Sequence, residues 1–293
     1  MDIDKLLVPT TKLFEAIEVY KTSMTLRPEG EHYASHIKLL DFKFNRNHLI
    51  TRLREAIIDW VFSKVEADRI FNEEFGADED RNAASTALYI AARETIRIEA
   101  PQGQFGELVL SGFLQHLFRA VPLLRKQPVR TSDHLERFGA DAIHISGGTP
   151  TKLYLGESKC YTSKYRFSAA FKASIESIHT TVENFDSEIK KFRTGNFIQE
   201  ELKPIALSIL KNQVEDLEIY PVCMVIYNET EKLSGNGSRE RKEEIKKAIM
   251  HRCDNITSDS YSAVDETILD RCTYIIFPVW DLEKLLDDFT KAL

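Results

Sequence analysis

The chain has 293 residues, and 43% of them are hydrophobic, which is enough to bury a substantial core. Its formal net charge of −7 gives no overall basic footprint for nucleic acid, so such a function would need a local basic channel or bound metal ions. The apolar runs are shorter than about 18 residues and the N-terminus lacks a signal-peptide pattern, so we expect a cytoplasmic protein without a membrane span. The four cysteines have no C-x-x-C spacing and are expected to be free thiols.

Residues 1–99 are predicted to form a mainly helical accessory region that contains few strands. The stretch His36–Phe44 is the one strand expected there. Apolar residues recur at helical spacing from Asn47 to Phe71, which predicts one long amphipathic helix. A second helix is expected over Ala77–Ile96, because its start is acidic and capped.

Residues 100–293 are predicted to form an α/β domain with a mixed central sheet flanked by helices, because strands alternate with helices there. A helix is expected within Gly103–Leu124, with Glu107 at its beginning, and a longer one over Phe167–Phe192. Further along, we expect buried strands at Ile219–Tyr227 and Cys272–Trp280, and helices at Arg239–Met250 and Asp281–Leu293.

Two short strands, Gly139–Ser146 and Lys152–Tyr161, are expected to form a hairpin through a Gly-Gly-Thr-Pro turn. A register centred near the turn pairs Ile143 with Leu155 and, at the far end, Asp141 with Glu157. These side chains then share one sheet face with Lys159, because side chains alternate along a strand.

Facing carboxylates destabilise a sheet unless a positive charge lies between them. A divalent cation held by Asp141 and Glu157, with Lys159 beside it, would remove this conflict. Glu107 is a third candidate ligand, since a carboxylate on the apolar face of a helix needs a partner. Taken one at a time, the residues have simpler explanations: a helix N-terminal charge for Glu107, an ion pair for Glu157 and Lys159, and a turn cap for Asp141.

A helix glutamate, a G-x-D at a strand start and an E-x-K on the next hairpin strand resemble the motif of the PD-(D/E)xK nuclease superfamily. The helix that follows is also what that fold requires. One departure is Ala140, which stands where the motif usually has proline.

Three longer segments, GELVLSGFLQHLF, RFGADAIHI and LYLGESKCY, occur in this order and resemble the HamA family, the effector subunits of the Hachiman anti-phage system, and its relative AbpA. The resemblance is good from Pro101 to about Phe192, looser over the N-terminal part and weak over the C-terminal strands. It implies a DNA nuclease that needs Mg²⁺, with Mn²⁺ as a substitute. It also implies a complex with a HamB-like superfamily 2 helicase and degradation of DNA in the infected cell.

The resemblance assigns a role to each motif residue. Asp141 and Glu157 would bind the metal ion, and Glu107 would bind it directly or through water. Lys159 would orient the attacking water and neutralise developing charge. Lys164, Arg166 and Lys172 follow the site and could contact the DNA backbone, although a solvated surface role is the simpler reading for these three.

Two other functions remain open on the sequence alone. The chain could be a catalytically silent nuclease-fold subunit that binds DNA or a helicase, or it could cleave RNA. The complete set of acids and lysine favours the enzyme. His144 is expected to point away from Asp141 and to serve in packing or at the surface.

Overall fold

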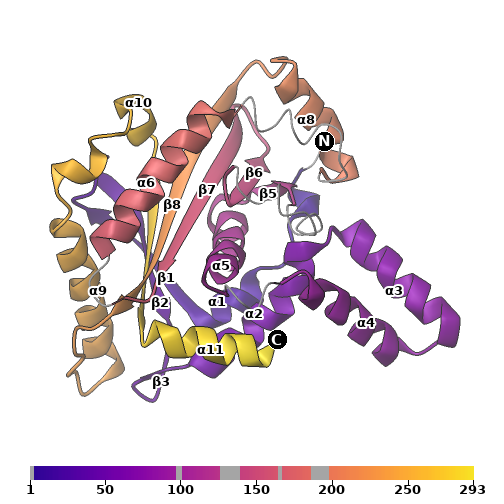
Figure 1. The fold of residues 1–293 in the computed structure, drawn as a ribbon, viewed down its shortest axis with the longest axis horizontal. Helices are drawn as coiled ribbons and strands as arrows, with labels where there is room; N and C mark the ends of the chain where they lie inside the picture. The colour runs from indigo at the N-terminus through magenta and orange to yellow at the C-terminus, as the bar shows by residue number, and fades with distance from the viewer. Residues whose placement is uncertain (1–2, 97–100, 126–138, 164–166, 186–197) are drawn as a thin grey trace.

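The structure is a computed structural model that describes residues 3–96, 101–125, 139–163, 167–185 and 198–293. A seven-stranded mixed sheet forms its centre, with the strand order β1-β2-β9-β8-β7-β6-β5 (Figure 1). Strands β2, β9, β8 and β7 are parallel to one another, and β1, β6 and β5 join antiparallel to their neighbours. The strands span Ile17–Met24 (β1), Gly30–Ile37 (β2), Val121–Leu124 (β5), Ala142–Ser146 (β6), Thr151–Tyr161 (β7), Leu217–Glu229 (β8) and Thr273–Trp280 (β9).

Helices cover both faces of the sheet, and the parallel strands are therefore apolar on both sides. On β8, Val222 and Met224 face a core shared with α2 (Arg46–Val61), α5 (Pro101–Phe118) and α11 (Leu282–Ala292). The alternate residues Cys223 and Val225 face a second core, shared with α6 (Phe167–Glu183) and α9 (Ser238–Asp254). Figure 1 shows α6 lying across β7 and β8. The predicted α/β class with a mixed, helix-flanked sheet is confirmed.

The prediction that the N-terminal region is strand-poor is wrong for residues 17–37. Strands β1 and β2 pair over eight positions, and β2 joins the central sheet by pairing in parallel with β9. The stretch His36–Phe44 is also not one strand, since β2 ends at Ile37 and a small separate hairpin of β3 (Leu39–Leu40) and β4 (Lys43–Phe44) follows. The first 99 residues therefore complete the sheet as well as supplying helices.

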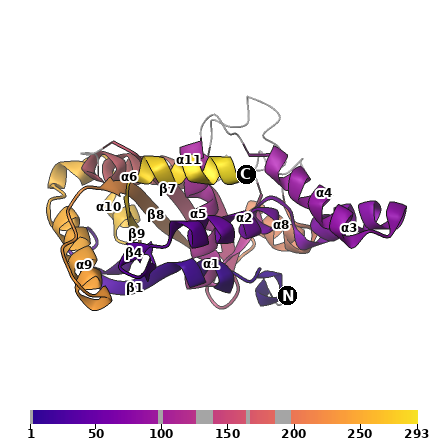
Figure 2. The ribbon, with the colours of Figure 1, turned by 90° about the horizontal axis from the view of Figure 1, so that it is seen from below.

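The long helix expected from Asn47 is divided into α2 and α3 (Lys64–Asp78). Ser63 separates them as the N-cap of α3, where its side chain accepts a hydrogen bond from the backbone N of Glu66. The next helix, α4 (Arg81–Glu94), begins as expected after an acidic cap, because the Asp80 side chain accepts from two backbone N–H groups. Together α3 and α4 form an arm that projects from the body of the molecule (Figures 1 and 2).

The predicted strands and helices of the second half are found where the structure describes them, with one exception. Helix α6 ends at Glu183 and Asn184 is a turn, so the single helix expected over Phe167–Phe192 is interrupted there, and residues 186–192 lie outside the described residues. The elements not anticipated include β5, α8 (Lys203–Leu210) and α10 (Glu266–Leu269). The shorter N-terminal helices are η1 (Ile3–Leu6) and α1 (Thr11–Ala16), and two further 3₁₀ turns are η4 (Glu200–Leu202) and η5 (Ser258–Tyr261).

The four cysteines are buried free thiols, as expected. None of the helices in the described ranges is both long and apolar enough to cross a membrane.

Candidate active site

The hairpin of β6 and β7 has the predicted register, with Ile143 opposite Leu155 and Ile145 opposite Leu153. Strand β7 is longer than β6. It pairs with β8 along its whole length, but its ladder with β6 ends at the pair of Ala142 and Gly156. Residues 157–161 of β7 therefore pair with β8 on one side only. We call the open edge on the other side, where β6 has ended beside Glu157 and Ser158, the fork.

Asp141 lies at this fork, directly before β6. Its Oδ2 accepts two hydrogen bonds from Ser158, one from the backbone N at 2.8 Å and one from Oγ at 3.0 Å. The Asp141 carboxylate thus engages the edge of β7 where the ladder has stopped, and neither donor of Ser158 occupies Oδ1. This is a more elaborate setting than the turn cap considered from the sequence.

Glu157 comes next on β7 and is only 3% exposed. Its Oε1 accepts from Lys159 Nζ at 2.6 Å and from Ser177 Oγ at 2.7 Å. Its Oε2 is buried and has no hydrogen-bond partner among the described residues. A buried carboxylate oxygen without a donor is costly, so Oε2 is the atom of this site that is best suited to accept a proton or a cation.

The electrostatics of the pair agree with this geometry. Burial, and after it the charge of Asp141, raises the pKa of Glu157 to about 7. Burial would lower the pKa of Lys159, but the charge of Glu157 and its hydrogen bond outweigh that effect and raise it. The single positive charge of Lys159 therefore does not neutralise the two carboxylates of Asp141 and Glu157. The donor set fits a hard divalent cation, which binds carboxylate oxygens.

Glu107 does not begin its helix, because α5 starts at Pro101. The stabilisation of an acid at a helix N-terminus falls off within the first turn, which removes that explanation for Glu107. The residue is half-buried, and its neighbour Gly106 lies so close to β7 that an added Cβ would be 2.8 Å from Ser158 Oγ. Helix α5 thus contacts β7 at the fork through Gly106, the residue before Glu107.

The helix α5 nevertheless packs on the sheet face opposite to Glu157. An added Cβ at Gly156 would lie 2.9 Å from Leu110 Cδ2 of α5, whereas Glu157 contacts Ser177 of α6. Within the described residues, no three or more His, Cys, Asp and Glu side chains cluster closely enough to hold a metal ion. The structure therefore brings Asp141, Glu157 and Lys159 together, while a ligand role for Glu107 stays a prediction.

The remaining candidates have other partners or lie outside the described residues, although His144 lines a small cavity together with Asp141. His144 is buried, and its Nδ1 is 2.9 Å from the carbonyl oxygen of Ala120, which confirms a packing role. Burial lowers the pKa of His144 to about 3. Lys172 is on α6 and forms an exposed ion pair with Asp259 at 3.0 Å. Lys164 and Arg166 lie outside the described residues.

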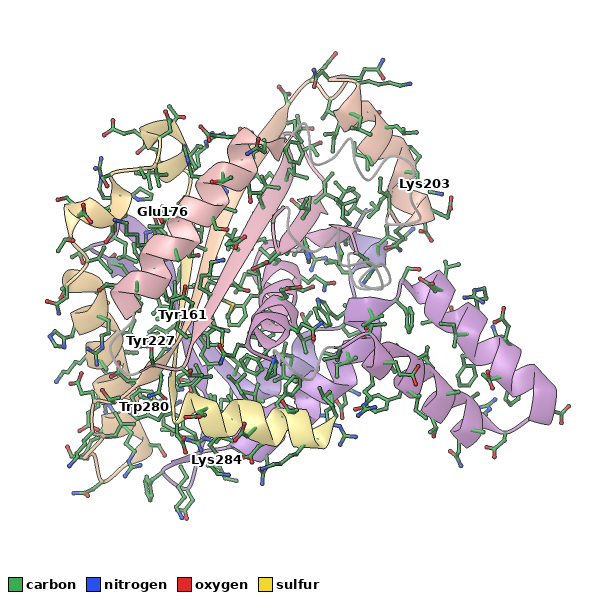
Figure 3. The ribbon with its side chains drawn as sticks, in the orientation of Figure 1. Tyr161, Glu176, Lys203, Tyr227, Trp280 and Lys284 are labelled. Atoms are coloured by element: carbon green, nitrogen blue, oxygen red, sulfur yellow. The ribbon has the colours of Figure 1, made fainter. Side chains whose placement is uncertain are left out.

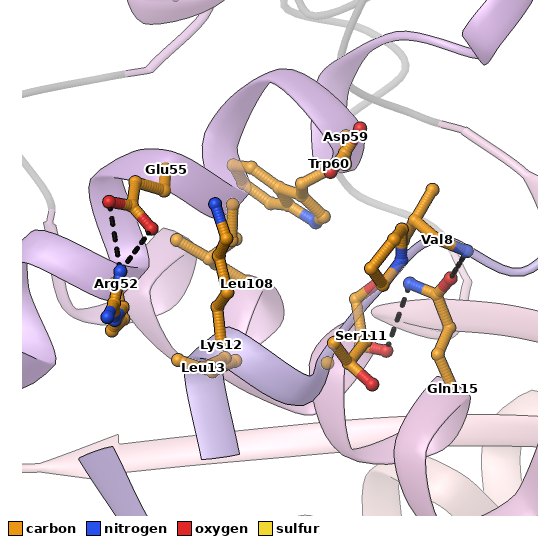
Figure 4. Close-up of a pocket in the computed structure, with 14 residues that line it drawn as sticks. Val8, Lys12, Leu13, Arg52, Glu55, Asp59, Trp60, Leu108, Ser111 and Gln115 are labelled. Atoms are coloured by element: carbon orange, nitrogen blue, oxygen red, sulfur yellow. Dashed lines mark hydrogen bonds and ion pairs between the residues drawn. The ribbon is translucent and has the colours of Figure 1, made fainter. Parts of the chain in front are cut away.

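A cavity of about 190 Å³ lies elsewhere, between the N-terminal segment, α2 and α5 (Figure 4). Two of its charged residues pair with each other, since Arg52 donates to both carboxylate oxygens of Glu55. The residues around it include neither Asp141 nor Glu157. It is therefore separate from the candidate site.

Ser177 is the part of the cluster that sequence reasoning missed. Its helix was expected, but only the apolar positions of that helix were used to define it. Glu176, the preceding residue, marks this part of α6 in Figure 3. A hydroxyl-bearing residue on the helix that packs over the E-x-K strand is the signal that could have identified it.

The comparisons with known proteins give one result that bears on this site. No curated protein matches the chain. The model of the HamA family matches residues 14–293, which is nearly the whole chain and includes all four motif residues. The chain therefore belongs to the HamA family, a component of the Hachiman defence system.

Proposed function

We propose that this chain is a metal-dependent deoxyribonuclease that hydrolyses phosphodiester bonds as the effector of a Hachiman system. The observation that carries the proposal is the buried Oε2 of Glu157, which lacks a hydrogen-bond partner among the described residues and has Asp141 as its acidic neighbour. A salt bridge with Lys159 that served stability alone would not need this second acid. The resemblance to the PD-(D/E)xK motif supports the same reading.

Glu157 and Asp141 would hold Mg²⁺ or Mn²⁺, and Glu107 would reach the ion through water. When bound, the cation supplies Lewis-acid chemistry: it lowers the pKa of a water ligand and stabilises negative charge on the phosphate. Glu157 contributes Oε2, because its other oxygen is already engaged by Lys159 and Ser177.

Lys159 would act at the reacting phosphate. Its ammonium group has three donors, and one of them binds Glu157. The side chain is 25% exposed, and we expect its remaining donors to meet a water or a phosphate oxygen. It would orient the nucleophile and stabilise charge that develops in the transition state. The backbone of DNA would be held by sequence-independent contacts, for which Lys172 is one candidate.

The test is incubation of the purified protein with plasmid DNA and Mg²⁺, with and without EDTA. We expect cleavage that requires the metal and stops on chelation. A parallel reaction with RNA of similar length separates the two nuclease classes. If DNA is bound but stays intact at all Mg²⁺ and Mn²⁺ concentrations, the catalytically silent subunit is the correct reading.

We further propose that a superfamily 2 helicase holds the nuclease inactive in the cytoplasm, because a free DNA-degrading enzyme would be toxic. The N-terminal helices and α11 are the proposed contact surfaces. The α3–α4 arm exposes two apolar side chains, Val65 at 57% and Ile90 at 46%. Such side chains on a projecting arm suit a protein partner.

Co-expression with the helicase encoded beside the gene is expected to yield a complex that co-purifies. Val65→Asp combined with Ile90→Asp should weaken it, whereas a lysine substitution of exposed Thr86 on α4 should not. Failure of the unsubstituted proteins to co-purify would contradict the partner proposal. It would leave the nuclease proposal in place.

A further inference from the structure

The orientation of the Glu157 carboxylate is set from two directions. Lys159 donates to Oε1 from the same strand, two residues further along β7, at 2.6 Å. Ser177 donates to the same oxygen from α6, at 2.7 Å. Both donors therefore engage one oxygen, and the other oxygen stays buried without a hydrogen-bond partner among the described residues.

The two donors differ in how firmly they are held. A lysine reaches its partner through a flexible four-carbon stem and can follow either carboxylate oxygen when the group rotates. Ser177 has a short side chain on a helix that is anchored by three fully buried apolar residues, Phe171, Ile175 and Ile178. Its hydroxyl thus has a fixed position relative to the sheet, and it distinguishes the two oxygens where the lysine does not.

We propose that Ser177 is a positioning residue of the metal site, whose hydroxyl holds Oε1 of Glu157 against α6 so that Oε2 faces the bound cation. This inference rests on the proposed function and adds a residue to it. Partners that orient a metal-binding side chain commonly change metal affinity by about 10–100-fold when they are removed. Without the hydroxyl, the carboxylate can turn, and the ion loses a pre-oriented ligand.

The same helix provides a matched control. Ser174 lies one turn before Ser177 and is fully buried, and its Oγ has no hydrogen-bond partner among the described residues. Ser174→Ala and Ser177→Ala thus remove the same atom from the same helix, but only the second removes a hydrogen bond to Glu157. Ser177→Thr retains the hydroxyl on a half-buried residue and serves as the rescue variant.

The experiment is a titration of the purified full chain with Mn²⁺, in which free Mn²⁺ is followed by electron paramagnetic resonance without DNA. We expect Ser177→Ala to raise the Kd for Mn²⁺ by about tenfold or more. Ser174→Ala and Ser177→Thr should keep the Kd of the unsubstituted protein. Thermal unfolding without metal identifies any variant that fails to fold.

A second measurement distinguishes weaker metal binding from a defect in the cleavage step itself. In the plasmid assay, Ser177→Ala should regain most of its cleavage rate at high Mg²⁺, because the ligand itself is still present. Equal Mn²⁺ affinity of Ser177→Ala and Ser174→Ala, or loss of cleavage that Mg²⁺ does not restore, would overturn the positioning role alone. If the unsubstituted protein binds no Mn²⁺, both this inference and the proposed metal site are overturned.

Discussion

Replacement of Glu157 by glutamine is expected to reduce Mg²⁺-dependent DNA cleavage by about a thousandfold or more, as loss of transition-state charge stabilisation does. The amide keeps the size of the side chain, and its oxygen can still accept from Lys159 and Ser177. It cannot supply the anionic oxygen that the cation requires. The measurement is the rate of plasmid cleavage at saturating Mg²⁺.

The same variant is expected to stay within about 1 kcal/mol of the unsubstituted protein when metal is absent, because loss of the repulsion from Asp141 offsets loss of the ion pair with Lys159 and burial of the amide nitrogen. Glutamine removes the charge that Oε2 carries without a hydrogen-bond partner among the described residues, and with it the repulsion from Asp141. Thermal unfolding in EDTA measures this change. Glu176→Gln is the matched control, because it makes the same substitution at a half-buried position on α6 beside Ser177. It should alter neither activity nor stability.

Variants of the neighbouring residues distinguish ligands from supports. Lys159→Ala should slow cleavage by about 10²–10³-fold and leave Mn²⁺ binding largely intact. Asp141→Ala should abolish cleavage and, unlike Glu157→Gln, lower the metal-free stability, because Ser158 loses the acceptor of two hydrogen bonds. Residual cleavage by Glu157→Gln together with a loss of stability would mean that Glu157 and Lys159 are a structural ion pair.

The hairpin could be predicted because its determinants are local. Alternation of apolar residues fixed the faces, and the turn fixed the register, which the pairs Ile143–Leu155 and Ile145–Leu153 reproduce. The predicted pairing of Asp141 with Glu157 does not form, because the ladder ends at Ala142 and Gly156 and Asp141 accepts from Ser158 instead. That ending depends on where β6 stops while β7 continues beside β8, which the local pattern does not determine.

The parts that could not be predicted depend on distant segments. Strand β1 is polar at several positions and directly follows α1, so local periodicity gives it no strand signal. Strand β2 pairs with its neighbour β1 over eight positions, but its place in the central sheet depends on parallel pairing with β9, more than 200 residues later, at Tyr33–Ile275. The division between α2 and α3 was missed because apolar spacing continues past Ser63, whose capping role outweighs it. Ser177 became visible only when α6 was placed over β7.

A second large effect is expected at Glu229, at the carboxyl end of β8, where Glu229→Ala should lower the free energy of unfolding by about 3–5 kcal/mol. The Glu229 side chain is 0% exposed and forms a bidentate pair with Arg252 of α9, at 2.6 and 3.0 Å. It also accepts from the backbone N of Thr230 at 2.7 Å and of Glu231 at 2.9 Å. Alanine leaves a partly buried arginine and two backbone donors without their acceptor.

The pH dependence of stability provides an independent check on Glu229. Burial alone would raise its pKa, but Arg252 and the two backbone donors outweigh burial and lower the pKa below the ordinary value of 4.5. Because the folded-state pKa is the lower one, this stabilisation is present above about pH 4.5 and is lost as the pH falls through the folded-state value. Glu229→Ala should therefore differ most from the unsubstituted protein at neutral pH and progressively less in acid.

Thermal unfolding should show a melting temperature lower by roughly 10 °C for Glu229→Ala at neutral pH. Glu231→Ala is the control, since that side chain is 47% exposed and its carboxylate Oε2 lies 3.8 Å from Nδ1 of His251. Its stability should stay within about 0.5 kcal/mol of the unsubstituted protein. The candidate metal site, with Glu157, lies on the neighbouring strand β7. A Glu229→Ala variant that remains folded should therefore still bind Mn²⁺. A shift as small as that of Glu231→Ala would mean that the buried pair contributes nothing net to holding α9 on the sheet.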